Sequence, residues 1–150
     1  MKIGGVKVTS SEEVLVLPRN EENIVFKAKA VSINDDFDRL CPVPNPPMII
    51  TKEGKQPDFT DANYKQQMAI RDEKRFAYMM LRSLEPSQIE WEQVNLEAPN
   101  TWLGWTQELI DAGLSDVEVN RVIGIVMTAC SLDEEKIEQA RADFLRGQGE

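Results

Sequence analysis

The stretch IVFKAKAVSINDDFDRL, from Ile24 to Leu40, changes its hydrophobic period halfway along. In its first half, apolar residues occupy every second position: Ile24, Phe26, Ala28 and Ala30. In its second half they recur four and three residues apart: Ile33, Phe37 and Leu40. The first spacing is typical of a strand and the second of a helix, so we expect a strand followed by a short helix. Asp35 and Asp36 lie early in that helix, where its positive end favours carboxylates.

Strand patterns also occur at residues 6–8, 14–17 and 48–51. Within 14–17 either alternating set is apolar, Val14 with Val16 or Leu15 with Leu17. Pro18 suits the end of a strand, because proline cannot donate a ladder hydrogen bond. We therefore expect two or three short antiparallel strands in the first thirty residues, and a later strand at 48–51 before a turn at 52–55.

The second half of the chain reads as mainly helical. Thr60 or Asp61 can cap a long helix that runs to about Leu84. Asn100 can begin another helix, and Gly113 suits its end because glycine accepts a left-handed conformation. Residues 89–96 fit either a strand or an irregular connection.

Two capping boxes follow, in each of which a serine and a glutamate three residues later satisfy each other's free amides. They are Ser115–Glu118, flanked by the hydrophobic staple pair Leu114 and Val119, and Ser131–Glu134. The final helix carries three apolar positions: Ile137, Ala140 and Phe144. The fold class is therefore predicted as α+β, with a small N-terminal antiparallel sheet and a short helix before a mainly helical C-terminal part. We expect one domain over 1–150, with a β-rich subregion at 1–57 and a helical one at 58–150.

Charge and hydropathy bear on the partners. The 150 residues include 26 Asp and Glu against 17 Lys and Arg, a net charge of −9 that would repel a phosphate backbone. We therefore expect no nucleic-acid partner. The longest uncharged apolar stretch, Val122–Leu132, is about half of the roughly 20 residues that span a membrane, and Met1–Val8 lacks a signal-peptide core. We expect a soluble cytoplasmic protein with no membrane partner.

The residue types exclude much catalytic chemistry. The chain has no histidine, which removes Ser-His-Asp triads and histidine metal sites. Asn34, Asp36 and Asp38 begin like a calcium loop, but Arg39 replaces its required glycine. Cys41 and Cys130 belong to no C-x-x-C pair. We expect no catalytic, metal or cofactor site.

Large apolar side chains are the candidates for partner binding: Phe76, Met79, Met80, Trp102 and Trp105. Trp102 and Trp105 are three residues apart on one helix face. The segment Phe76–Leu81 is apolar almost all round, which indicates burial on several sides or a shared surface. The patterns favour core packing for all five residues, with partner binding as the alternative role.

The order of these features resembles the tail assembly chaperones of long-tailed bacteriophages. The resemblance spans about residues 12–146 and rests on an F-K-x-K-x-(L/V)-S strand, an acidic F-x-x-L helix and a helix ending S-(L/V)-x-P. The matching positions are Phe26, Lys27, Lys29, Val31, Ser32, Phe37, Leu40, Ser83, Leu84 and Pro86. The family's motifs are mostly structural and carry no catalytic residue.

This resemblance implies a non-enzymatic protein of the infected host cytoplasm. Family members bind the tape measure protein, keep it soluble and help the tail tube protein polymerise around it; we also expect self-association into a homo-oligomer. The first alternative is a structural tail or head completion protein of the phage particle. The second is a small enzyme that uses carboxylates and a metal.

The stretch LCPVPNPPM, residues 40–48, contains four of the chain's eight prolines. It satisfies P-x-x-P, but the only nearby basic residue is Arg39, within the preceding helix. The helix must end before Pro42, because a proline pushes the residue before it out of the helical region. We expect a rigid spacer leading to the strand at Met48, with a peptide ligand as the alternative.

Overall fold

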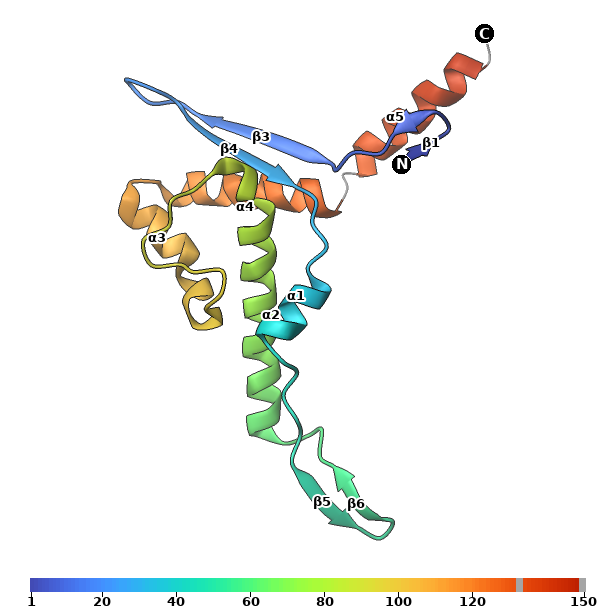
Figure 1. The fold of residues 1–150 in the computed structure, drawn as a ribbon, viewed down its shortest axis with the longest axis vertical. Coiled ribbons are helices and arrows are strands. Elements are labelled where there is room, and N and C mark those ends of the chain that lie inside the picture. The colour runs from blue at the N-terminus through green and yellow to red at the C-terminus, as the bar shows by residue number, and fades with distance from the viewer. Residues whose placement is uncertain (132–133, 149–150) are drawn as a thin grey trace. The chain divides into compact units, whose positions relative to one another are not determined.

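The computed structural model describes residues 1–131 and 134–148 (Figure 1). Its strands are β1 (Lys2–Ile3), β2 (Val6–Lys7), β3 (Glu12–Leu17), β4 (Ile24–Lys29), β5 (Met48–Thr51) and β6 (Gly54–Pro57). Its α-helices are α1 (Asn34–Leu40), α2 (Ala62–Ser83), α3 (Trp105–Ala112), α4 (Asp116–Ser131) and α5 (Glu134–Gln148). Two 3-10 helices are η1 (Glu85–Ser87) and η2 (Pro99–Gly104).

The α+β class is confirmed. The strands form three separate antiparallel hairpins, β1 with β2, β3 with β4, and β5 with β6, rather than one N-terminal sheet. The helices gather mostly in the C-terminal part. The strand at Met48–Thr51 and the helix at Asn34–Leu40 lie where their periodicities predict them.

The chain groups into two compact units. The first unit comprises Met1–Val31, Arg82–Glu90 and the described part of Leu109–Glu150. The second unit comprises Ser32–Leu81 and Trp91–Glu108. Both units draw residues from either side of residue 57, so neither coincides with the subregions 1–57 and 58–150. The assignment of all 150 residues to one domain stays a prediction.

In the first unit, the β3–β4 hairpin packs on α4 (Figure 1). Its register pairs Leu15 with Phe26 and Leu17 with Ile24. Both strands and α4 contribute buried side chains to this unit's core: Leu17, Phe26, Ala28, Val119, Val122, Val126 and Ala129. A hairpin alone is marginally stable, so α4 provides the apolar face that these strands need.

Local hydrogen bonds fix the end of α3 and the start of α4. Gly113 has φ +124°. Its N–H donates to Ile110 O at 3.0 Å while Leu114 N–H donates to Leu109 O at 3.1 Å, the Schellman pattern. The predicted capping box is also confirmed: Glu118 N–H donates to Ser115 Oγ at 3.2 Å, and Ser115 N–H donates to Glu118 Oε1 at 3.1 Å.

The staple residues Leu114 and Val119 are both buried. The second predicted box, Ser131–Glu134, includes positions outside the described residues. The two confirmed end motifs explain why the chain turns sharply between α3 and α4.

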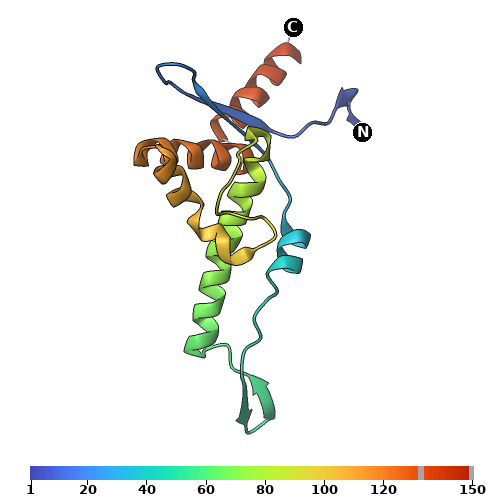
Figure 2. The same cartoon turned by 60° about the vertical axis from the view of Figure 1, so that its left-hand side comes forward.

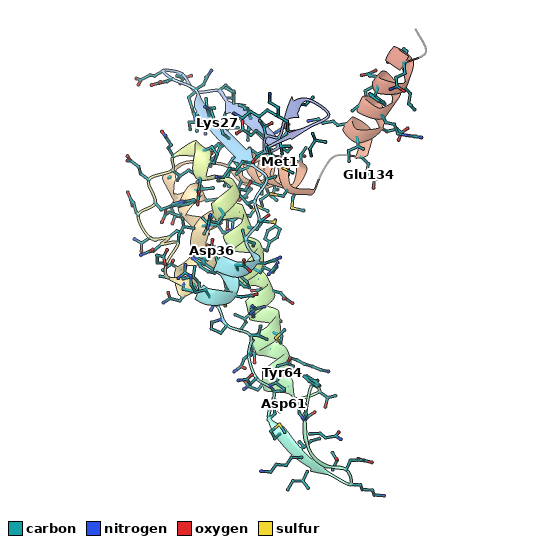
Figure 3. The ribbon with its side chains drawn as sticks, turned by 45° about the vertical axis from the view of Figure 1, so that its right-hand side comes forward. Met1, Lys27, Asp36, Asp61, Tyr64 and Glu134 are labelled. Carbon is teal, nitrogen blue, oxygen red and sulfur yellow. The ribbon has the colours of Figure 1, made fainter. Side chains whose placement is uncertain are left out.

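In the second unit, Asp61 begins α2. Its Oδ2 accepts the Tyr64 N–H at 2.9 Å, which is the cap that the sequence predicts (Figure 3). Thr60 instead hydrogen-bonds Asp58. The β5–β6 hairpin extends beyond this end of the helix (Figures 1 and 2).

Three details of the second unit refine the sequence-based expectations. The helix predicted from Asn100 starts as the 3-10 segment η2 and becomes α-helical only at Trp105. Residues 91–96 contain neither helix nor strand, so this part of the 89–96 segment is an irregular connection. Residues 41–47, most of the proline-rich stretch, are likewise irregular and join α1 to β5. Their role as a spacer rather than a ligand stays a prediction.

Candidate partner-binding surfaces

The described residues offer few groups that could bind a metal or carry out catalysis. Within residues 1–131 and 134–148, no three His, Cys, Asp or Glu side chains are grouped so that they could hold a metal ion. Both cysteines are free and half-buried; the Cys130 thiol donates to Lys29 O at 3.8 Å. None of the described helices combines the length and hydropathy needed to cross a bilayer.

One surface depression of about 380 Å³ lies at the start of α1. Its lining is polar: Ser32, Asn34, Asp35 and Asp36. The side chain of Asn34 is already hydrogen-bonded to Arg75. The depression is therefore an acidic surface hollow at the start of the helix.

Trp102 lies at the centre of an aromatic cluster in the second unit. Its ring stacks on Tyr78 with centroids 4.6 Å apart, and the Phe37 ring lies 6.2 Å from it at a tilt. The indole Nε1–H donates to Asn95 O at 2.9 Å, so the buried polar atom is satisfied. Trp102 has no exposed surface and is a core residue here.

Two arginines of α2 hold α1 against this cluster. Arg71 Cζ lies 4.7 Å from the Phe37 ring centroid, and Arg75 Cζ lies 5.4 Å from it. Arg71 also donates to Asp38 Oδ1 at 2.6 Å and to Cys41 O at 3.0 Å. These contacts account for a buried arginine, since its charge is paired and its guanidinium lies over an aromatic face.

The five predicted partner-binding residues divide into two groups. Met80, Trp102 and Trp105 are buried, which is the core role that the sequence left open. Phe76 is 43% exposed and Met79 is half-buried, so these two reach the surface of α2. Partner binding through any of the five stays a prediction, with Phe76 and Met79 the accessible members.

Helix α5 carries an apolar face. The spacing of its residues predicts this face, but only the structure shows that it is exposed. None of its described residues is buried. Ile137 and Phe144 are seven residues apart and therefore share a face, and Leu145 adjoins them. All three are large exposed hydrophobic residues, Phe144 at 62%. We call Ile137, Phe144 and Leu145 the α5 stripe.

The β5–β6 hairpin is exposed on both faces. Met48 and Ile50 are exposed, Ile50 at 84%, and every described residue of β6 is exposed. Next to the hairpin, the exposed Phe59 ring contacts Tyr64 edge-on at 5.9 Å. A two-stranded hairpin with no covered face is marginal in water, so this element gains stability if a partner covers it.

A third apolar surface lies on the β3–β4 hairpin, opposite α4. Val14, Val16 and Val25 are exposed there, and Val16 pairs directly with Val25. Both faces of β3 carry apolar residues, so the sequence does not indicate which face points outward. In the structure Leu17 is buried and the two valines are exposed.

A bidentate ion pair joins two distant segments of the first unit. The Arg19 guanidinium donates to both carboxylate oxygens of Glu118, at 2.8 and 2.9 Å. This contact, together with the Ser115 amide, lowers the pKa of Glu118 to about 2. In the second unit, hydrogen bonds from Thr60 lower the pKa of Asp58. Both shifts favour an ionised carboxylate and indicate structural rather than acid–base roles.

No protein-family model, curated protein or solved structure matches this chain.

Proposed function

We propose that this chain is a non-enzymatic phage tail assembly chaperone. In this proposal it binds the tape measure protein in the host cytoplasm, keeps it soluble and assists polymerisation of the tail tube protein. The sequence resemblance supplies the family, and exposed apolar surfaces supply the physical support. The proposal includes no cofactor and no nucleic-acid partner.

The α5 stripe is the observation that carries the proposal. Helices of about 12–15 residues are marginal in water unless an apolar face is packed. The α5 helix has 15 residues and no buried residue, yet it presents Ile137, Phe144 and Leu145 to solvent. A long amphipathic helix has the matching chemistry, because its own apolar stripe can pack against such residues at helical spacing.

The overall charge supports the same role. A chaperone that covers apolar helices must keep the complex in solution, and a net charge of −9 opposes aggregation through repulsion between complexes. The β5–β6 hairpin adds a second apolar contact in Met48 and Ile50. Together these surfaces suit a partner that is long and repetitive rather than a small ligand.

Co-expression with the tape measure protein from the same phage tests the proposal. The measurement is the soluble fraction of the tape measure protein and its co-purification with this chain. We expect the wild-type chain to raise both, and the double substitution I137D/F144D to reduce both strongly. The matched control is V117D on α4, which alters a residue that is 65% exposed outside the stripe.

A failure of the wild-type chain to associate with the tape measure protein would contradict the proposal. Mass spectrometry of purified virions separates it from the alternative, a structural tail or head completion protein. We expect the chain to be absent or scarce in virions, whereas a structural subunit would be present in stoichiometric amounts.

A further inference from the structure

Strand β3 has a free edge whose hydrogen-bonding groups can be identified residue by residue. Ala30 N–H donates to Ser11 O at 2.8 Å, which fixes the phase of the antiparallel ladder. Hydrogen-bonded pairs then alternate with pairs whose backbone groups point away from each other. On β3 the outward-pointing residues are Glu12, Val14 and Val16.

The opposite edge of this hairpin is closed. On β4 the outward residues include Lys27 and Lys29. The Ser87 hydroxyl accepts from Lys27 N–H at 2.7 Å and donates to Lys27 O at 2.7 Å, and Ser83 Oγ–H donates to Lys29 O at 2.7 Å. Side chains thus occupy the positions that another strand would use. Figure 3 marks Lys27 on this strand.

The free edge is also apolar. No described residue is hydrogen-bonded through its backbone to the outer groups of β3, and the hairpin is a two-stranded sheet. The side chains of Val14 and Val16 are more than half exposed. Monomeric proteins normally protect such an edge with lysine, proline or a bulge, and here the protecting residues, Glu12 and Pro18, lie only at its two ends.

We propose that β3 pairs antiparallel with β3 of a second copy of this chain, centred on Val14, to form a four-stranded sheet. Only one edge of the hairpin is open, so the same edge must serve both copies. Such an isologous contact closes after two copies, whereas two open edges would permit unlimited stacking. The strand thereby gains partners for its outer N–H and C=O groups.

Charge favours the antiparallel arrangement, and the missing N–H of Pro18 favours this register. Centring on Val14 sets Glu12 of each copy opposite Val16 of the other, and every outward residue then has both an N–H and a C=O to offer. A parallel in-register pairing would place the two Glu12 carboxylates side by side, which is unfavourable. Shifting the centre to Leu15 would oppose Glu12 with Pro18, which lacks an N–H.

This inference does not rest on the proposed function, because it concerns the purified chain alone. A dimer through β3 would serve a chaperone and a particle subunit equally. Failure to bind the tape measure protein would therefore not contradict the β3 dimer. Equally, a monomeric chain would not contradict the chaperone proposal.

Sedimentation analysis of the purified chain provides the first test. We expect a dimer at micromolar concentration, and we expect V14P to weaken dimerisation by at least about tenfold, because proline removes an outward N–H. V14K is the second variant, since it retains the backbone donor but places a charge at the edge. The control is V25K, which alters the same sheet face away from the open edge. Circular dichroism verifies that each variant is folded.

Cysteine cross-linking tests the register. Residues of a hydrogen-bonded antiparallel pair have Cα atoms about 5.5 Å apart, within disulfide reach. We expect V14C treated with diamide to form a disulfide-linked dimer that peptide mapping assigns to position 14. V16C is the control, because its two copies would lie roughly 14 Å apart along the antiparallel strands. A monomeric wild type, dimerisation unchanged in folded V14P and V14K, or cross-linking in V16C but not in V14C would overturn the proposal.

Discussion

Arg19 and Glu118, 99 residues apart in the chain, are joined through the two terminal guanidinium nitrogens and both carboxylate oxygens. Glu118 also belongs to the capping box that begins α4. One side chain therefore ties the loop after β3 to the helix on which the hairpin packs. This double role makes it a sensitive position for stability.

We expect E118Q to lower the melting temperature by a few degrees, because glutamine keeps the capping geometry but loses the charged pair with Arg19. E118A should lower it further, since it also leaves the Ser115 amide without its acceptor. Thermal unfolding followed by circular dichroism measures both. Equal melting temperatures for E118Q and wild type would show that the ion pair contributes nothing.

The same pair predicts a pH dependence. The pKa of Glu118 is lowered from its ordinary 4.5 to about 2, chiefly by the hydrogen bond from Arg19. A carboxylate whose pKa is lower in the folded than in the unfolded state stabilises the fold at pH values above its unfolded-state pKa. This stabilisation is lost as the pH falls through the folded-state pKa. The difference in melting temperature between wild type and E118Q should be constant above pH 5 and shrink between about 4.5 and 2. A difference that persists unchanged at pH 2 would contradict this assignment.

Trp102 and Phe76 should respond differently to truncation. W102A removes a fully buried ring that stacks on Tyr78, and we expect it to reduce the free energy of unfolding by about 3–5 kcal/mol. F76A alters a partly exposed side chain and should reduce it by about 1 kcal/mol or less. Urea titration measures both. Similar losses for the two variants would argue against their separate core and surface roles.

We expect Ser87 both to stabilise the fold and to limit the number of copies of the chain that associate. S87A leaves both backbone groups of Lys27 without their partner and should reduce the free energy of unfolding by about 1 kcal/mol. It also frees the Lys27 N–H and C=O for a further strand, while Ser83 still occupies Lys29 O, so we expect a small fraction of assemblies larger than two copies in sedimentation experiments. The matched control is S10A, an exposed serine that precedes β3. If S87A stays at the size of wild type, the closed edge is not what limits association.

The β5–β6 hairpin should be an early site of proteolysis. Both faces are exposed, and little packing opposes its local opening. Trypsin is expected to cleave after Lys52 or Lys55 before it cleaves after Lys27, whose backbone N–H and C=O are both hydrogen-bonded to the Ser87 hydroxyl. Mass spectrometry of early fragments identifies the order. Protection of Lys52 and Lys55 in the presence of the tape measure protein would place this hairpin at the contact.

Local patterns in the sequence were sufficient to predict the ends of several helices. The capping box Ser115–Glu118 and the glycine at 113 define helix ends through hydrogen bonds within a few residues, so no distant contact is needed to predict them. The change of period at Ser32 similarly locates α1. These features depend on neighbours along the chain and are therefore readable from it.

Other features depend on residues far apart. Trp102 is buried because Tyr78 and Phe37 surround it, and spacing within one helix cannot show that. Strand β6 was missed because its sequence, GKQP, has poor strand propensity, and its pairing with β5 comes from the turn at Lys52 and Glu53. The outward face of β3 was ambiguous because both of its faces are apolar.

The interleaving of the two units has a consequence during synthesis on the ribosome. All of the second unit lies between Ser32 and Glu108, whereas the first unit needs both Met1–Val31 and residues beyond Leu109. Because chains emerge from the N-terminus, the second unit can fold while the β3–β4 hairpin still lacks α4. The apolar residues of that hairpin thus stay uncovered while the 86 residues between Lys29 and Asp116, and then α4 itself, are translated.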